Sequence, residues 1–340
     1  MSDIFNKLLI LRTPGIGPAK YNALVQKFGT PADIVAVLNP SDQLRDTVST
    51  EMARAAEQHI YYISDTDELY PRALRATKNH PPVITVRGNL ELLQRDMVSI
   101  VGTRHATAAG MEFVADIAHA FASHDTAVVS GMAIGTDTAA HLGALRCANG
   151  AGTIAVLAGG VDYIWPIENE SLYWDIVSRG AVISEMPVGF TPVANNFVMR
   201  NRIVAGLSSR LILGEADLKS GSMTTARFAH ELNREIWAIP SHPSDLRAIG
   251  PNSLIRDGVA KLCMGASDFF AAPKKDINMK KNSKKFDTEN SLIDAIGTIP
   301  VSESVLAEIV KKSISEIKSE LVVLELGGLV RRVDGGYVRA

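Results

Sequence analysis

Apolar runs that end in glycine-rich turns recur along the middle of the chain and predict its central domain. Amphipathic segments separate these runs, and strands that alternate with helices form a parallel sheet with both faces covered. We therefore predict a Rossmann-like α/β domain, with a largely parallel sheet, over residues 63–272. Six runs carry this prediction: MVSIVGTR, TAVVSGMAIGTD, TIAVLAGGVD, GAVISEMPVG, RLILGEADLKSGS and REIWAIPS.

A further strand is expected at the edge of this sheet. The segment 70–89 precedes the first run and contains Pro81 and Pro82. Proline has no N–H to donate to a neighbouring strand, so it is confined to edge strands and strand ends. We expect this segment to form a loop and an edge strand.

The segments on either side of the central domain have different patterns. Residues 1–62 show short helical stretches around the turn TPGIGPAK, and they predict a small helical domain. After the centre, PKKDINMKKNSKKF holds six lysines and one aspartate without apolar periodicity. This composition predicts a flexible basic linker over residues 273–287.

Residues 288–340 predict a winged helix-turn-helix domain. Two helical stretches are followed by a glycine pair, a short strand, a DGG turn and another short strand. The second helix carries Lys318 among three glutamates. Such a module binds DNA or proteins, and the acidic helix leaves a protein-interaction role open.

Composition and charge narrow the class of protein. The chain has 340 residues, 46% hydrophobic and 21% charged, which is typical of a folded multidomain protein, and its net charge of -2 decides nothing about nucleic acid. Cys147 and Cys263 lack metal-ligand spacing, so no metal site is expected. We see no signal peptide and no apolar stretch long enough to span a membrane, so a cytoplasmic protein without membrane contact is expected.

Three of the glycine-rich turns carry groups that bind anions. In an α/β sheet, such turns lie at the carboxyl ends of strands, where helix N-termini present free N–H groups and positive dipole ends. One such turn is explained equally well by packing, but three beside the RNR segment 200–202 favour a polyanion. The candidate ligands in these turns are Thr103, Arg104, Ser130, Gly131, Gly135, Ser220, Gly221, Ser222 and Thr225.

The segment 199–207 fits a helix that places its arginines differently. Its apolar residues fall on one side, with Arg200 at the margin and with Asn201 and Arg202 away from it. We therefore expect Arg202 to be the freer ligand. Arg200 could instead form a structural salt bridge, with Glu215 or Glu185 as the candidate partner.

Signals for a nucleotide cofactor or for catalysis are missing. The chain has neither a GxGxxG turn with its later acidic residue nor a GxxxxGK[ST] loop, so no cofactor is expected. Asp137 and His141 share one helix face and could act as acid and base. We favour a structural role, with Asp137 at a helix N-terminus and His141 bonded to it. Tyr163, Trp165, Tyr173 and Trp174 are interpreted as packing residues, and no enzymatic activity is expected.

The motifs together resemble the DprA/Smf family of bacterial DNA-processing proteins, over residues 65–262. The segments that carry the resemblance are IVGTRHATAAG, VVSGMAIGTDTAAH, FVMRNRIVAGLS and GEADLKSGSMTTARFA. The ends are similar to the family's variable ends, a SAM-like or helix-hairpin-helix start and a winged-helix finish. The resemblance implies a homodimer that binds single-stranded DNA without sequence preference, protects incoming strands and loads RecA in natural transformation.

The resemblance also implies roles for particular residues. Arg104 would hold a phosphate, the Ser130–Gly131 and SGS turns would donate further hydrogen bonds, and Phe197 would stack on a base, beside Arg200, Asn201 and Arg202. Some family members have a lysine where this chain has Ala194, so one phosphate contact is expected to be missing.

Two alternatives remain open at this point. The turn TPGIGPAK resembles the hairpin of helix-hairpin-helix domains, in which Gly15, Gly17 and Lys20 would contact a DNA phosphate. A steric origin of that turn is the other interpretation. The enzymatic rival is a Rossmann-fold nucleotide phosphoribohydrolase of the lysine-decarboxylase-like group, whose PGGxGT signature has no counterpart in this chain.

Overall fold

The computed structural model describes residues 3–270, 292–297 and 299–340. The chain divides into two compact units, Met1–Ala272 and Pro273–Ala340, and each is described by itself. The predicted basic linker, residues 273–287, lies outside the described residues.

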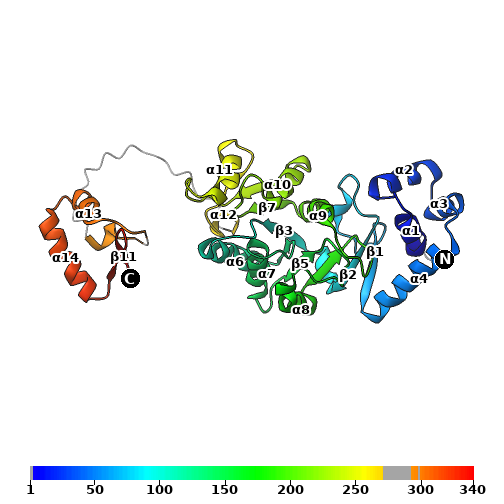
Figure 1. Ribbon diagram of the computed structural model, residues 1–340, viewed down its shortest axis with the longest axis horizontal. Coiled ribbons are helices and arrows are strands. Elements are labelled where there is room, and N and C mark those ends of the chain that lie inside the picture. Colours follow the sequence, from blue (N-terminus) through cyan, green and yellow to red (C-terminus); the bar gives the residue numbers. More distant parts are fainter. Residues whose placement is uncertain (1–2, 271–291, 298) are drawn as a thin grey trace. The chain divides into compact units, whose positions relative to one another are not determined.

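A nine-stranded sheet forms the centre of the first unit, in the order β1-β2-β6-β5-β4-β3-β7-β8-β9 (Figure 1). The strands from β6 to β9 in this order are parallel, whereas β2 is antiparallel to both β1 and β6. All six predicted runs are strands, which confirms the α/β class. The strands are β1 (Ile60–Ser64), β2 (Val83–Gly88), β3 (Asp96–Val101), β4 (Thr126–Ser130), β5 (Thr153–Val156), β6 (Ala181–Ser184), β7 (Arg210–Leu213), β8 (Glu235–Ala238) and β9 (Lys261–Leu262).

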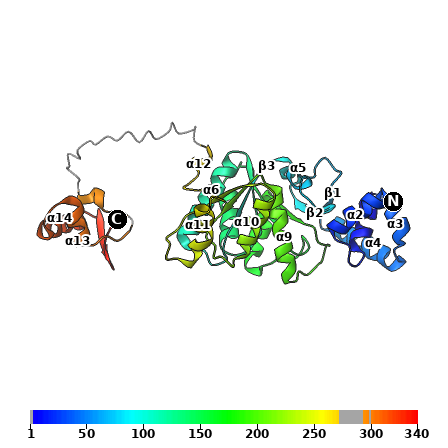
Figure 2. The same ribbon diagram turned by 90° about the horizontal axis from the view of Figure 1, so that it is seen from above.

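Helices cover both faces of the sheet (Figures 1 and 2). Successive residues of β3 point to opposite faces, so Val98 and Ile100 pack with the α6–α7 layer while Met97 and Val101 pack with the α9–α10 layer. Each fully buried side chain of this size contributes about 1.5–3 kcal/mol of burial free energy. The helices are α6 (Ala108–Ser123), α7 (Thr136–Leu145) and α8 (Glu170–Arg179) on one face, and α5 (Arg72–Arg75), α9 (Ala194–Leu207), α10 (Gly221–Glu231) and α11 (Ile249–Arg256) on the other.

Four helices precede the sheet and enclose a small core of their own, centred on Leu8, Leu9 and Ile34. Thr30 starts α3 with a capping box, in which its hydroxyl accepts from Asp33 N–H and the Asp33 carboxylate accepts from Thr30 N–H. The predicted turn TPGIGPAK links the first two helices, with Gly15 at φ +77°. The four are α1 (Asp3–Arg12), α2 (Pro18–Phe28), α3 (Pro31–Leu38) and α4 (Asp42–Glu57).

Two details of the predicted sheet are wrong. The strand in the 70–89 segment is β2, and it lies between β1 and β6 rather than at the edge. Pro81 and Pro82 precede β2 instead of lying in it, so its backbone is free to pair on both sides. The edge strand on this side of the sheet is β1, and it starts at Ile60, before the predicted end of the helical domain at residue 62.

The second unit has the predicted winged-helix layout. Its helices pack around a core that includes Leu306, Ile317, Leu321 and Tyr337, and the two strands form an antiparallel wing. Its elements are η4 (Leu292–Ala295), α13 (Glu303–Val310), α14 (Ile314–Leu326), β10 (Val330–Val333) and β11 (Gly336–Arg339).

The strand order creates one place where a ligand crevice is expected. After β3 the chain builds β4, β5 and β6 on one side, and then returns to add β7, β8 and β9 on the other. The loops that follow β3 and β7 therefore diverge at the carboxyl edge of the sheet. In open α/β sheets, ligands bind at such a switch point.

Candidate nucleic-acid interface

A cavity of about 440 Å³ lies at this switch point. Four segments line it: the loop after β3, the loop after β4, one side of α9, and the turn that leads into α10. Most of the predicted ligands lie here together. Among the lining residues are Thr103, Arg104, Gly131, Phe197, Arg200, Asn201, Ser220, Gly221, Ser222 and Thr225.

Arg200 forms a buried cationic part of the cavity wall, with only 8% of its surface exposed. Its Nη1 donates to the carbonyl of Gly131 at 2.7 Å and also to the carbonyl of Val156. Burial lowers the pKa of the Arg200 guanidinium to about 10, and the negative charge of Asp137 opposes that shift. The side chain therefore stays positive at neutral pH and is held in place by backbone oxygens.

Gly131 leaves room for this arginine. A Cβ atom at Gly131 would lie 2.8 Å from Arg200 Cζ and 2.8 Å from the Asp137 carboxylate. That carboxylate in turn accepts from the N–H groups of Gly131 and Ala133, at 3.1 and 3.3 Å. The turn after β4, the start of α7 and the arginine of α9 are thus packed as one unit.

An exposed cation and two aromatic rings lie side by side near the cavity. The Arg104 guanidinium lies 4.9 Å from the centre of the Trp165 ring, and the Trp165 and Phe197 rings meet edge to face at 4.6 Å. Sequence reasoning treated Trp165 as a packing residue because its own segment has few cations. The cation comes from the distant loop after β3, which only the fold brings close.

The N-terminus of α10 supplies polar groups to the opposite wall. Ser220 caps this helix, and its hydroxyl accepts from Ser222 N–H at 3.4 Å and lies 2.7 Å from the Ser222 hydroxyl. Unpaired N–H groups and the dipole at a helix N-terminus favour an anion. Lys219 also lines the cavity and is exposed. Sequence reasoning missed this lysine, although it directly precedes the SGS motif that was singled out.

Two predicted ligands have structural roles. The Ser130 side chain is fully buried and its hydroxyl donates to the Ile100 carbonyl at 2.7 Å, so it joins β4 to β3 and does not line the cavity. Gly135 lies at φ +80°, where a Cβ would come within 2.6 Å of the Thr103 carbonyl. It allows the loops after β3 and β4 to approach each other, and it is not a lining residue.

The expected roles of the two arginines are reversed. Arg202 is not the freer one: it forms an ion pair with Glu185, donates to the Asn79 carbonyl at 3.3 Å, and does not line the cavity. Arg200 faces the cavity and pairs with neither expected glutamate. Glu215 instead accepts from Thr107, at 2.7 Å from its N–H and 2.6 Å from its hydroxyl.

The Asp137–His141 interaction is also absent. His141 Nδ1 lies 2.7 Å from the Thr153 hydroxyl, and that hydroxyl donates to the Val128 carbonyl, so the histidine is a buried link to β5. Burial lowers the pKa of His141 to about 3, which keeps its ring neutral.

Within the described ranges, no group of three or more His, Cys, Asp or Glu side chains could hold a metal ion. No helix among those ranges is long and apolar enough to cross a membrane.

The remaining candidates, Gly15, Gly17 and Lys20, lie outside this cavity. All three are exposed: Gly15 and Gly17 lie in the turn between α1 and α2, and Lys20 lies in the first turn of α2. A Cβ atom at either glycine would meet no heavy atom within 4 Å, so close packing does not require glycine there. DNA contact at this turn stays a prediction.

Two family models match the chain. Residues 61–273 match DNA recombination-mediator protein A, and residues 283–336 match the DprA winged helix domain. The first match contains every residue that lines the cavity.

Individual proteins agree with these matches. Protein Smf of Synechocystis sp. is 39% identical over 206 residues, which cover 59% of this chain and 51% of that protein, so the chain spans about half the length of this relative. The structure of DNA processing protein A from Streptococcus pneumoniae is 30% identical with a TM-score of 0.66, and the match covers 79% of this chain and 96% of that one. The corresponding protein from Helicobacter pylori, which binds single-stranded DNA, is 30% identical with a TM-score of 0.57, over 62% of this chain and 95% of that one. With the first family model alone extending over more than half of its residues, this chain belongs to the DprA/Smf family.

Proposed function

We propose that the chain binds single-stranded DNA through its phosphate backbone at the switch-point cavity. One observation carries the proposal: Arg104, Arg200 and Lys219 border the same cavity as the N-terminus of α10. Cations and helix N-termini both favour anions. A backbone phosphate of DNA is an anion that would use several of these groups at once.

The position of the aromatic rings supports a single strand over a duplex. Phe197 lines the cavity, and Trp165 contacts both Phe197 and the cationic Arg104. Unpaired bases are free to stack on aromatic side chains, and every base has a face that can stack. Contacts of this kind, combined with phosphate contacts, bind strands without sequence preference. The DprA protein of Helicobacter pylori is a single-strand binder of the same family.

Loss of Arg104 should reveal the phosphate contact. We expect Arg104→Ala to weaken binding of a fluorescent oligothymidylate strand on the order of tenfold, since charge-assisted hydrogen bonds contribute about 1.5–3 kcal/mol. The slope of the logarithm of the binding constant against the logarithm of the salt concentration should also become shallower by about 0.7, the value for one phosphate contact on a single strand. Fluorescence anisotropy at several salt concentrations measures both quantities.

Arg146→Ala is the matched control for this experiment. Arg146 is an exposed arginine that pairs with Glu112 and Asp116 and does not line the cavity. Its removal should leave affinity and salt slope unchanged. Equal affinity of Arg104→Ala and wild type would refute the phosphate grip. If wild type hydrolyses nucleoside monophosphates instead of binding the strand, the phosphoribohydrolase becomes the better explanation.

We further propose that the bound strand is handed to RecA, and that the protein acts as a homodimer in natural transformation. Membership of the DprA/Smf family supports both parts. Light scattering at several protein concentrations tests the dimer, and filament assembly by RecA on protein-coated strands, with and without this protein, tests the loading. A monomer at every concentration, or unchanged RecA assembly, would contradict the respective part.

A further inference from the structure

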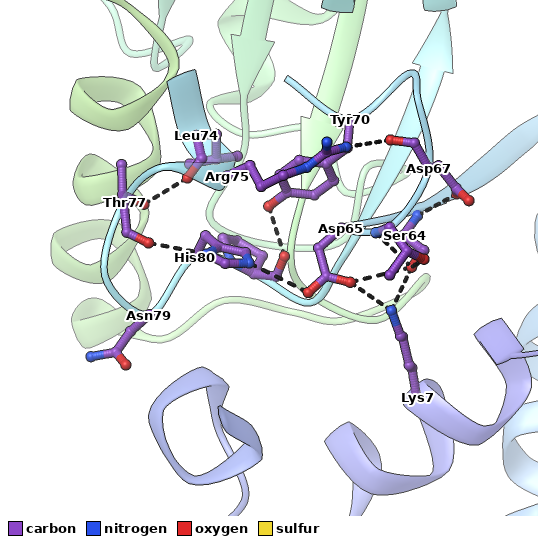
Figure 3. Close-up of polar contacts among 12 residues, drawn as sticks. Lys7, Ser64, Asp65, Asp67, Tyr70, Leu74, Arg75, Thr77, Asn79 and His80 are labelled. Atoms are coloured by element: carbon purple, nitrogen blue, oxygen red, sulfur yellow. Dashed lines mark hydrogen bonds and ion pairs between the residues drawn. The ribbon is translucent and has the colours of Figure 1, made fainter. Parts of the chain in front are cut away.

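A cluster of charged side chains joins the N-terminal helices to the α/β domain. Lys7 of α1 has a side chain only 3% exposed, and its Nζ lies 2.5 Å from Asp65 Oδ1 and 2.6 Å from the Ser64 hydroxyl. Figure 3 shows Lys7 extending from α1 to Asp65, with His80 on the other side of that carboxylate. Asp65 is therefore shared by two basic residues.

His80 is placed so that both ring nitrogens face acceptors. Nδ1 lies 3.0 Å from the Thr77 carbonyl, and Nε2 lies 3.4 Å from Asp65 Oδ2. Neither acceptor can donate a proton when Asp65 is ionised. A neutral imidazole has one N–H, so only the protonated ring satisfies both contacts.

The other groups around His80 are fixed as well. The Tyr70 ring meets the His80 ring edge to face at 6.0 Å, and its hydroxyl donates to the Pro81 carbonyl at 2.7 Å. Arg75 lies over the Tyr70 ring and opposes the positive charge on His80. The hydrogen bond to Asp65 is the chief cause of a raised His80 pKa, and burial opposes it.

The loop that contains His80 also contacts α9. The carbonyl of Asn79, next to His80 in the chain, accepts from Arg202 of α9, and Arg202 is paired with Glu185 after β6. Leu74 packs so closely on this helix that a Cβ at Gly206 would lie 2.9 Å from its Cδ1. Arg200 and Asn201, which line the cavity, directly precede Arg202 on α9.

We propose that His80 is a positioning residue for the DNA site: when protonated, it bridges Asp65 and the Thr77 carbonyl, and this holds the loop that anchors α9 through Arg202. The inference rests on the proposed function of the cavity. It makes strand binding depend on a residue that does not line the cavity, and it couples that dependence to pH.

The direction of the pH effect follows from the raised pKa of His80. A raised folded-state pKa means that the contribution is fully present below the unfolded value of about 6.5, and is lost as the pH rises through the folded value. The bridge is therefore complete near pH 6 and loses one contact at higher pH. The test stays below about pH 8.5, because Arg200, with a pKa of about 10, must remain charged.

The test compares His80→Gln with wild type in oligothymidylate binding across this pH range. Glutamine cannot become a cation, so the variant should bind about two- to thirtyfold more weakly near pH 6, the range of coupling usual for residues that touch neither ligand. The difference between the two affinities should shrink as the pH rises, because the raised pKa of His80 means that the ring loses its proton only above its usual range. Asp65→Asn should move the midpoint of the pH profile downward, which a merely structural role would not do.

His105 needs its own control because it is a second histidine and lines the cavity itself. The comparison of His80→Gln with wild type is therefore repeated with His105→Gln added to both proteins. The His80-dependent part of the profile should persist in this background, and the double variant should be flat. Parallel profiles with and without His80 would overturn the proposal.

A second measurement works without DNA. Hydrogen exchange of the α9 amides should be faster in His80→Gln than in wild type near pH 6, and the difference should shrink as the pH rises toward 8.5. Equal exchange at both pH values would overturn the inference. If wild type binds no single strand at any pH while the exchange difference is present, the proposed function fails but the coupling of His80 to α9 stands.

Discussion

Gly131 fixes the distance between the sheet edge and the buried Arg200. A methyl group at this position would overlap both the guanidinium and the Asp137 carboxylate, each 2.8 Å away. Both groups are buried and hydrogen-bonded to backbone atoms, so neither can move without breaking those bonds. At the residue scale, the absence of a side chain is therefore as important for the site as the charges are.

We expect Gly131→Ala to lower the free energy of unfolding by about 1–3 kcal/mol, the usual cost of overpacking a close-packed site. Single-strand affinity should fall as well, because Arg200 is displaced from the cavity wall. Chemical denaturation and anisotropy measure the two effects. Gly297→Ala is a suitable control, since a Cβ there meets no atom within 4 Å and Gly297 does not line the cavity. Wild-type affinity in a folded Gly131→Ala protein would show that the position of Arg200 is unimportant.

The sequence indicated which loops lie at the carboxyl edge of the sheet, but not in which direction the side chains of α9 point. Thr103, Arg104 and the SGS residues were found because glycine turns after strands must lie at one sheet edge. The roles expected of Arg200 and Arg202 were reversed, because a helical wheel distinguishes only the apolar face of a helix from its polar face. It carries no information on Glu185, which captures Arg202, or on the carbonyls that hold Arg200.

Helix α9 is the element on which the site depends most, because it carries Phe197, Arg200 and Asn201. Its first turn is fixed by Asn196, whose side-chain oxygen accepts from the Val193 N–H at 2.9 Å. Such contacts at a helix start stabilise the first turn. Phe197 lies in that turn, so its position depends on the cap.

Asn196→Ala should destabilise the protein by about 0.5–2 kcal/mol, as the loss of a cap does elsewhere. It should also weaken strand binding, because Phe197 is presented by a less ordered turn. Thr30→Ala removes a capping hydroxyl from α3 in the same unit and leaves α9 intact. A similar loss of stability in both variants, with weaker binding in Asn196→Ala alone, is the expected result of melting and anisotropy measurements. Equal strand binding by the two variants would show that the Asn196 contact does not affect the DNA site.

At the element scale, strands were predictable where an apolar run is bounded by turn residues, and were not predictable elsewhere. The six apolar runs all form strands, because parallel strands buried on both faces require nearly continuous apolar sequence. The strand β9 has two residues, both exposed, and β1 follows directly on a helical region. Neither leaves a pattern that distinguishes it from a loop or a helix end, so their pairing becomes visible only in the fold.

For the whole molecule, the cavity belongs to one of two compact units. All of its lining residues lie within Met1–Ala272, and the Lys7–Asp65–His80 cluster lies there as well. The winged helix has its own buried core. The second helix of that domain, α14, carries Glu316, Glu320 and Glu325, which disfavour contact with phosphates.

A chain that ends at Ala272 should therefore bind a short oligothymidylate strand with an affinity close to that of the whole protein. Its salt slope should also be unchanged, because the same phosphate contacts remain. Titrations of both proteins by anisotropy, on a strand short enough to occupy one cavity, make this comparison. A much weaker truncated protein would mean that the six lysines within residues 273–287, or the winged helix, contribute phosphate contacts. A chain extended through residue 287 distinguishes these two sources, since it restores the lysines without the winged helix.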